Sequence, residues 1–330
     1  MLEINLSNLS KNVRAVTTAN RKLIAVVKND AYGCGALAVS RHLVSIGVDF
    51  LLVNDIYEAV PLLEDGINVK ILVHNSVPEQ MYNLLKQYGN LVVTINSLAD
   101  AISLSKAEVN NINVHIQIDT KMNRLGIKDL NEFDKTMEIL KANSKFNIDG
   151  IYTHFASPKT MDEQLCLFKQ FTKKYDFPNI HCAATSTFSL TDYGNYVRVG
   201  LGLYDINQVM SVKTKPIVIK DIKAGEAVGY ESEYVAHNDT KVAVLPIGYG
   251  DGYRRRFEGF YVMANGVKYN IIGRICMNHI FVEIDDNVSK DTVFEILSEN
   301  LPASVLGKYA NCSNYEIYTM FKVHGVEYKL

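Results

Sequence analysis

Short apolar runs rich in β-branched residues alternate with amphipathic stretches of helical length over the first two thirds of the chain. Continuous apolar runs separated by helices are typical of a parallel sheet that is covered on its outer face. The predicted strands are 22–28, 48–54, 69–74, 91–95, 114–119, 148–155, 179–185 and 196–200. The predicted helices are 7–20, with Ser7 as its N-cap, and then 36–46, 56–64, 79–88, 98–107, 130–142 and 162–175. Eight such strand–helix units close into a (β/α)8 barrel, the TIM-barrel fold.

The pattern changes beyond about residue 208, where helical runs become nearly absent. The predicted strands there are 212–222, 241–247, 260–264, 267–272, 279–284 and 292–297, and Asn265-Gly266 is a predicted hairpin turn. We therefore expect a second, mostly β domain that follows the barrel without a flexible linker.

Composition and charge narrow the class of protein. The chain has 330 residues, 48% of them hydrophobic, which is enough for one large core and one smaller core. A net charge of -2 favours neither a nucleic-acid partner nor a membrane surface. The amino terminus lacks a signal-peptide pattern, and no apolar stretch reaches membrane-spanning length, so we expect a cytoplasmic protein. The five cysteines are scattered without metal-like spacing, so we expect reduced thiols and no metal site.

Lys28 stands at the exit of the first predicted strand, in the run Ala25-Val-Val-Lys28-Asn-Asp-Ala-Tyr32-Gly33. Partial burial at a strand end lowers the pKa of an amine and makes it a nucleophile toward carbonyl groups. The alternative is an ordinary lysine whose stem lies on the strand end and whose charge reaches water.

Further polar residues follow the predicted barrel strands at their carboxyl ends, where barrel enzymes carry their active sites. They are Asp119 at the end of strand five with Arg124 beyond it, His154 at the end of strand six, Thr185-Ser186 at a predicted helix start after strand seven, Arg198 on strand eight, and Gly200-Leu201-Gly202 after it. Each has an ordinary structural explanation on its own, as a cap, a core histidine or an ion-pair partner. Together with a strand-end lysine, they indicate an aldehyde cofactor with a phosphate tail, and pyridoxal 5'-phosphate fits that description.

At this point the chain resembles the alanine racemases. The lysine run is similar to the family's pyridoxal-lysine motif, and the other matching motifs follow in order along nearly the whole chain. They are Asp119-Thr-Lys-Met-Asn-Arg124-Leu-Gly126, Thr153-His154-Phe-Ala156, Arg198-Val-Gly200, Leu203-Tyr204, Val228-Gly-Tyr230, Gly248-Tyr249-Gly-Asp251-Gly252, Gly273-Arg-Ile-Cys-Met277 and Asn314-Tyr315-Glu316. The resemblance implies a barrel domain at 8–208, and a β domain at 209–330 that includes residues 1–7.

The resemblance also implies a role for each matched residue. Lys28 would hold pyridoxal phosphate covalently and act as one of two opposed bases at the α-carbon, and Tyr230 would be the other base. His154 would be the partner of the Tyr230 phenol, and Arg198 would contact both His154 and the pyridine nitrogen. Because arginine keeps its proton, that nitrogen should stay unprotonated.

The remaining assignments concern the cofactor phosphate, the substrate and the partner subunit. The resemblance assigns the phosphate to Tyr32, Ser186, Tyr315 and the backbone N–H groups of Gly200 and Leu201. It assigns the substrate carboxylate to Arg124, the backbone N–H of Met277 and the neighbouring Tyr249. In this family the tyrosine base and the carboxylate-binding methionine come from the partner's β domain, which implies a homodimer.

Several positions depart from the family pattern. Gln117 stands where many members carry a lysine, often carbamylated, that orients the substrate-binding arginine. A neutral amide supplies no negative charge, so we expect Arg124 to pair with a bound anion or to be held less firmly. Lys121 and Asn123 replace glycines, Cys34 replaces a histidine and Asn278 replaces an aspartate.

The resulting hypothesis is an isomerase, an alanine racemase that interconverts L- and D-alanine and supplies D-alanine for peptidoglycan. A racemase of serine or another small amino acid is the alternative enzyme, because apolar pockets reject an added hydroxyl poorly. A non-catalytic barrel protein that binds pyridoxal phosphate is the non-enzymatic alternative.

Overall fold

The fold is described from a computed structural model, which covers residues 1–17, 20–323 and 325–330. The chain divides into two compact units. The barrel unit consists of residues 10–31 and 35–203, and the β unit consists of residues 1–9, 32–34 and 204–330. Each unit is considered by itself.

Eight parallel strands close into a barrel within the described residues, as the sequence predicts. The strands are β2 (Lys22–Val26), β3 (Phe50–Val53), β4 (Lys70–Val73), β5 (Leu91–Ile95), β6 (Ile112–Gln117), β7 (Phe146–Tyr152), β8 (Asn179–His181) and β9 (Tyr196–Val199). Each pairs with the next, and β9 closes the barrel on β2 with Arg198 opposite Ile24. Most strands end earlier than predicted, because the polar residues after them leave the hydrogen-bond ladder and form the rim loops.

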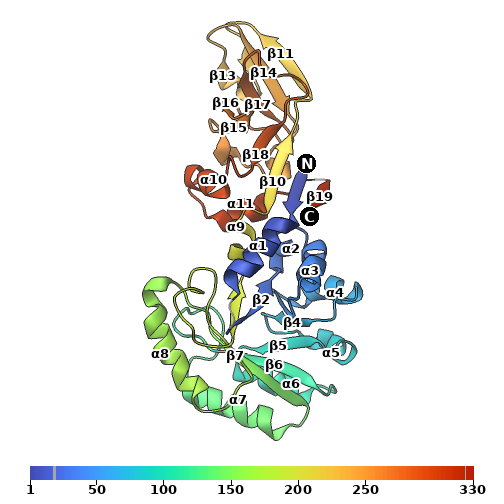
Figure 1. The fold of residues 1–330 in the computed structure, drawn as a ribbon, viewed down its shortest axis with the longest axis vertical. Helices are drawn as coiled ribbons and strands as arrows, with labels where there is room; N and C mark the ends of the chain where they lie inside the picture. Colours follow the sequence, from blue (N-terminus) through green and yellow to red (C-terminus); the bar gives the residue numbers. More distant parts are fainter. Residues whose placement is uncertain (18–19, 324) are drawn as a thin grey trace. The chain divides into compact units, whose positions relative to one another are not determined.

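Helices lie around the outside of the barrel (Figure 1). They are α3 (Ala36–Ser45), α4 (Ile56–Glu64), α5 (Tyr82–Gln87), α6 (Leu98–Lys106), α7 (Leu130–Ala142) and α8 (Met161–Thr172), with 3-10 turns η1 (Glu79–Met81) and η2 (Pro158–Thr160). The side chain of Asp55 caps α4, and Ser97 and Asp129 cap α6 and α7. For these three helices the predicted starts at residues 56, 98 and 130 coincide with the observed ones.

The first helix, α1 (Leu6–Val16), corrects one detail of the sequence prediction. Ser7 is not its N-cap, because the Asn5 side chain accepts the N–H of Asn8 at 2.9 Å, one residue before the helix begins. The predicted end of this helix at residue 20 is wrong as well, since α1 ends at Val16, and residues 18–19 of that prediction lie outside the described residues.

The β unit contains a mixed sheet whose order, within the described residues, is β11-β14-β17-β16-β15-β18-β10-β1-β19. Its strands are β1 (Leu2–Asn5), β10 (Met210–Thr214), β11 (Val218–Ile222), β14 (Thr240–Leu245), β15 (Tyr261–Ala264), β16 (Val267–Ile272), β17 (Ile280–Ile284), β18 (Phe294–Leu297) and β19 (Val326–Lys329). A small hairpin pairs β12 (Ala227–Val228) with β13 (Tyr234–Val235). Asn265 and Gly266 form the predicted turn between β15 and β16, with φ of 50° and 77°.

Two predictions for the β unit are wrong. The single strand expected at 212–222 is two strands, because Pro216 lies between β10 and β11 and cannot donate to a ladder. Helices are also present, as α9 (Leu201–Asp205) bridges from the barrel, and α10 (Ala303–Ala310) and α11 (Asn314–Met320) follow the sheet, besides the 3-10 turns η3 (Tyr230–Ser232), η4 (Tyr249–Asp251) and η5 (Arg255–Phe257). These helices are too short to show a clear amphipathic period in the sequence, and tertiary contacts stabilise them.

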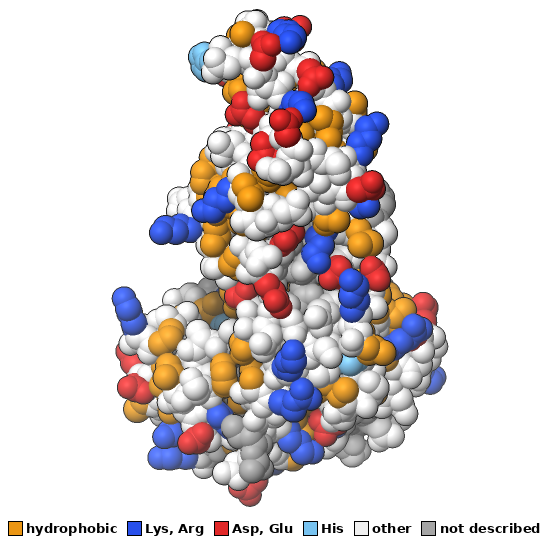
Figure 2. Space-filling model, turned by 45° about the horizontal axis from the view of Figure 1, so that its top comes forward, with side chains coloured by type: hydrophobic (Ala, Val, Ile, Leu, Met, Phe, Trp, Pro, Cys, Tyr) orange, Lys and Arg blue, Asp and Glu red, His pale blue; other side chains and the backbone are white. Residues whose placement is uncertain are grey.

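Charged side chains of both signs are interspersed over the visible face of the molecule (Figure 2). This distribution agrees with the net charge of -2 and gives that face no single-sign field. Among the described residues no helix combines the length and the apolar character that a membrane crossing requires. The same residues contain no cluster of three or more histidine, cysteine, aspartate or glutamate side chains suited to a metal ion.

Candidate active site

Lys28 begins a short helical turn, α2 (Lys28–Gly33), directly after β2. The four residues that follow Lys28 all have positive φ, from 51° to 58°, so the turn is left-handed. Left-handed backbone costs roughly 1–2 kcal/mol per non-glycine residue, and a run of four persists only where its surroundings hold it.

The carboxylate of Glu58 on α4 holds the start of this turn. Its Oε1 accepts the backbone N–H of Asn29 at 2.8 Å, and its Oε2 accepts the N–H of Asn54 at 2.8 Å. Asp30 fixes the other end, because its carboxylate accepts the N–H of Ala36 at 2.6 Å. Glu58 was missed by the sequence reasoning, since Asp55-Ile-Tyr-Glu58 has the spacing of an ordinary capping box.

The amine of Lys28 is partly buried at this position. Burial lowers the pKa of Lys28, and the positive charge of Arg124 lowers it further, while the nearby carboxylate of Glu58 opposes both effects. A larger neutral fraction of the amine at neutral pH follows, which is the form that attacks a carbonyl group.

Arg198 and His154 form the polar centre of the barrel. The Arg198 guanidinium, on a residue only 4% exposed, donates from Nη2 to His154 Nδ1 at 2.8 Å and to the carbonyl of Thr153 at 3.0 Å. It also lies over the ring of Tyr152, 5.0 Å from the centroid. Burial, and then the charge of Arg198, lower the pKa of His154 to about 2, so its imidazole is neutral with the proton on Nε2.

The loop that carries Arg124 keeps the backbone that glycines would adopt. Lys121 and Asn123, which depart from the family pattern, have φ of 75° and 55°, and Asp119 accepts the N–H of Asn123 at 2.9 Å. Arg124 itself is exposed, and its charge lowers the pKa of both Lys28 and His154. Arg124 follows β6, as Lys28 follows β2 and His154 follows β7, so all three lie at the carboxyl ends of parallel strands.

Gln117, at the position of the family's lysine, is buried at the end of β6. Its Nε2 donates to the carbonyl of Leu125 at 3.2 Å, and its Oε1 accepts the Tyr152 hydroxyl at 2.8 Å. The amide therefore ties the Arg124 loop to β7, although it contributes no charge.

The helix start expected at Ser186 is wrong. No helix begins at Ser186, because β8 already ends at His181 and residues 185–190 form turns. Ser186 is exposed there, whereas the hydroxyl of Thr185 accepts the N–H of Gly202 at 3.1 Å. Gly200 and Leu201 follow β9 as predicted, at the start of α9.

The β unit presents Tyr230, Tyr249 and Met277 at its surface, 67%, 45% and 57% exposed. The loops of Tyr249 and Met277 are neighbours, since Tyr249 donates its N–H to the carbonyl of Cys276 at 3.1 Å. Arg274 forms ion pairs with Glu231, inside the turn that Tyr230 begins, and with Glu233, which directly follows that turn.

Two further tyrosines of the expected site lie together in the β unit. The ring centroid of Tyr32 is 4.8 Å from that of Tyr204 and 6.0 Å from that of Tyr315. The structure therefore assembles the candidate residues as one group on the barrel rim and others on the β unit.

Comparison with known proteins identifies the family. The family model for the N-terminal domain of alanine racemase matches residues 4–208, and the model for the C-terminal domain matches residues 209–326. The chain belongs to the alanine racemase family. Membership in the alanine racemase family makes the chain an isomerase that interconverts the enantiomers of alanine.

Individual relatives match the chain over most of its length. An alanine racemase of Limosilactobacillus fermentum is 31% identical, over 96% of this chain and 94% of the relative. The alanine racemase of Clostridium difficile 630 has 27% identity and a TM-score of 0.92, covering 99% of this chain and 94% of that chain. The enzyme of Bartonella henselae, solved with covalently bound pyridoxal phosphate, has 26% identity and a TM-score of 0.89, covering 99% of both chains.

Proposed function

We propose that Lys28 covalently holds the pyridoxal phosphate with which this chain, as an alanine racemase, interconverts L- and D-alanine. The observation that carries the proposal is a partly buried lysine of lowered pKa, on the same barrel rim as the hydrogen-bonded pair of buried Arg198 and half-buried His154. The relative from Bartonella henselae binds pyridoxal phosphate covalently, and the donors present here fit that group. Lys28 offers an amine for its aldehyde, Arg198 a donor for its ring nitrogen, and Gly200 and Leu201 offer N–H groups for its phosphate.

The roles of the bases follow from the chemistry of inversion. When bound, the cofactor withdraws electrons from the substrate α-carbon and makes its proton acidic. Lys28 would remove or return that proton on one face, and Tyr230 would do so on the other, since a single base returns a proton to the side it came from. His154, neutral with its proton on Nε2, would orient the Tyr230 phenol. Arg198 would remain charged and donate to the ring nitrogen.

The binding assignments remain part of the proposal. Arg124, the N–H of Met277 and Tyr249 would bind the substrate carboxylate, because a cation and two hydrogen-bond donors suit an anion. For the phosphate, the resemblance adds Tyr32, Ser186 and Tyr315 to the two backbone N–H groups. The exposure of Ser186 and its lack of a helix start leave that hydroxyl accessible to a ligand.

We also propose that the enzyme is a homodimer in which each β unit completes the partner's site. The exposure of three large side chains, Tyr230, Tyr249 and Met277, on adjoining loops supports this, because such a group is more stable when covered. In this scheme residues 8–208 hold the cofactor and residues 209–330 with 1–7 supply the second base. The enzyme would act in the cytoplasm and provide D-alanine for peptidoglycan.

Exchange of the α-proton in deuterated buffer, with chiral analysis of the products, tests the reaction. L- and D-alanine should both exchange and racemise, and Lys28→Ala should lower racemisation by at least about 1,000-fold, because cofactor attachment and one base are lost together. Lys22→Ala, at the exposed start of the same strand, is the matched control.

A panel of small amino acids separates the alternatives in the same assay. A higher kcat/KM for serine than for alanine would make serine the preferred substrate. A cofactor absorbance band without turnover would indicate a non-catalytic protein that binds pyridoxal phosphate. Full racemisation by Lys28→Ala would refute its assigned role.

A further inference from the structure

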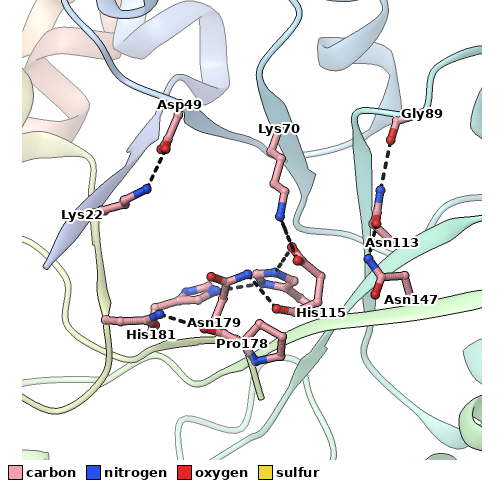
Figure 3. A network of polar contacts seen from close by, with 12 residues as sticks. Lys22, Asp49, Lys70, Gly89, Asn113, His115, Asn147, Pro178, Asn179 and His181 are labelled. Atoms are coloured by element: carbon pink, nitrogen blue, oxygen red, sulfur yellow. Dashed lines mark hydrogen bonds and ion pairs between the residues drawn. The ribbon is translucent and has the colours of Figure 1, made fainter. Parts of the chain in front are cut away.

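A hydrogen-bonded network of polar side chains runs from Arg198 through the barrel interior. Arg198 Nη1 lies 2.8 Å from His181 Nδ1, and His181 Nε2 lies 3.0 Å from His115 Nδ1. His115 Nε2 lies 3.1 Å from Asp149 Oδ2, and both oxygens of Asp149 lie 2.8 Å from Lys70 Nζ. Figure 3 shows His181 and His115 side by side, with Lys70 reaching toward them from β4. The Lys70 end of the network lies at the amino ends of the strands, since Lys70 is the first residue of β4.

Both histidines of this network, His115 and His181, are neutral. His115 and His181 are fully buried, and burial lowers the pKa of each, to well below the ordinary value for His181. Burial alone would raise the pKa of Asp149, but hydrogen bonds from His115 and Lys70 outweigh it and lower the pKa to about 2. At neutral pH this network therefore contains two cations at its ends, two neutral imidazoles and one carboxylate.

The two ends of the chain fix where each imidazole carries its proton. Arginine only donates, so His181 Nδ1 accepts from Arg198, and the His181 proton is on Nε2. A carboxylate only accepts, so the His115 proton is on Nε2 and its Nδ1 accepts from His181. All three hydrogen bonds then point the same way, from Arg198 to Asp149.

We propose that Asp149 is a positioning residue, which sets the tautomers of His115 and His181 and thereby fixes the guanidinium of Arg198 toward His154. A merely structural Asp149–Lys70 ion pair would not require this order. In Asp149→Asn the amide nitrogen can donate to His115 Nε2, which moves the His115 proton to Nδ1. The N–H groups of His115 Nδ1 and His181 Nε2 would then face each other and could not form a hydrogen bond. His181 then has to give up its acceptor for Arg198, so the guanidinium loses a fixed partner.

The first test observes the tautomers directly in the full chain without added cofactor. Nitrogen-15 NMR of the labelled histidine side chains, assigned with His115→Gln and His181→Gln, should show both residues protonated on Nε2. Asp149→Asn should shift this pattern and Asp149→Glu should restore it. Asp49→Asn changes a carboxylate that pairs with Lys22 and does not belong to the hydrogen-bonded network from Arg198 to Lys70. This variant should leave the pattern unchanged (Figure 3). Unchanged tautomers in Asp149→Asn would overturn the proposal.

The second test is kinetic and rests on the proposed racemase function. Asp149→Asn should lower kcat about 10-fold with little change in KM, as expected when a residue that orients a ligand-contacting group is altered. Lys70→Met keeps the carboxylate and should retain the tautomers and most of kcat, which also covers the case that Asp149→Asn does not fold. Equal losses in Lys70→Met and Asp149→Asn would leave only an ion-pair role. If the wild-type chain does not racemise alanine, the proposed function fails, while the NMR result still decides on Asp149.

Discussion

Glu58 shows how one side chain serves two backbone segments next to a reactive amine. Both of its carboxylate oxygens are used, one by the N–H of Asn29 beside Lys28 and one by the N–H of Asn54. Its charge also opposes the lowering of the Lys28 pKa. Glu58 therefore positions the lysine and limits the lowering of its pKa, without itself belonging to the expected catalytic set.

The residue-scale prediction concerns Glu58→Gln. A glutamine oxygen can accept only one of the two N–H groups, because its NH2 group faces the other donor, and a lost partner costs ~1–2 kcal/mol. We expect urea unfolding to show a loss of that size and cofactor titration to show weaker binding. Glu64→Gln makes the same change at the exposed end of α4 and should do neither. Wild-type stability and cofactor affinity in Glu58→Gln would contradict the bracing role.

At the scale of elements, the left-handed turn after β2 differs from the rest of the barrel. The strands and helices around it follow from periodicity, whereas residues 29–32 adopt a backbone that their side chains disfavour. The hydrogen bonds that the carboxylates of Glu58 and Asp30 accept offset part of that cost and hold the turn. Strained backbone of this kind occurs where function requires a fixed geometry, here the direction in which Lys28 leaves β2.

Substitutions at exposed Asn29 test the turn with little change in packing. Asparagine tolerates φ of 51°, whereas a β-branched valine does not, so Asn29→Val should lose ~1–2 kcal/mol of unfolding free energy. Asn29→Gly fits the left-handed region and should stay within about 0.5 kcal/mol of the wild type. Denaturant melts of the two variants give the comparison. Equal stability of valine and glycine would mean that residue 29 is not left-handed in solution.

At the scale of the whole molecule, the two proposed bases belong to different units of the chain. Lys28 lies in the barrel unit, and Tyr230 lies in the β unit on a turn whose next residue, Glu231, is ion-paired with Arg274. The exposure of Tyr230 leaves its phenol accessible to a second protomer. A site shared between protomers makes activity depend on the dimer.

Mixed dimers test the sharing directly. Lys28→Ala and Tyr230→Ala homodimers should each be nearly inactive, but refolding them together at equal amounts should restore about a quarter of wild-type activity. Half of the dimers are then mixed, and each mixed dimer has one site with both bases intact. Racemisation assayed before and after mixing gives the answer. No recovery, with subunit exchange verified by mass, would place both bases in one chain.

The barrel architecture followed from the sequence alone, and the sequence also grouped the candidate reactive positions. Period and burial pattern located all eight barrel strands, because continuous apolar runs between helices leave few other arrangements. The carboxyl ends of parallel strands converge, so Lys28, His154 and Arg198 could be grouped from their places on strands alone. The turn at Asn265-Gly266 followed from local backbone preference in the same way.

Only the tertiary structure decided the features that depend on contacts distant in sequence. The bond between Glu58 and Asn29 spans 29 positions, and that between His115 and His181 spans 66. No local pattern encodes such pairs, since barrel closure brings them together and burial then decides which groups are neutral. The missing helix at Ser186 has the same origin, because local capping preference lost to turns fixed by the ends of β8 and β9.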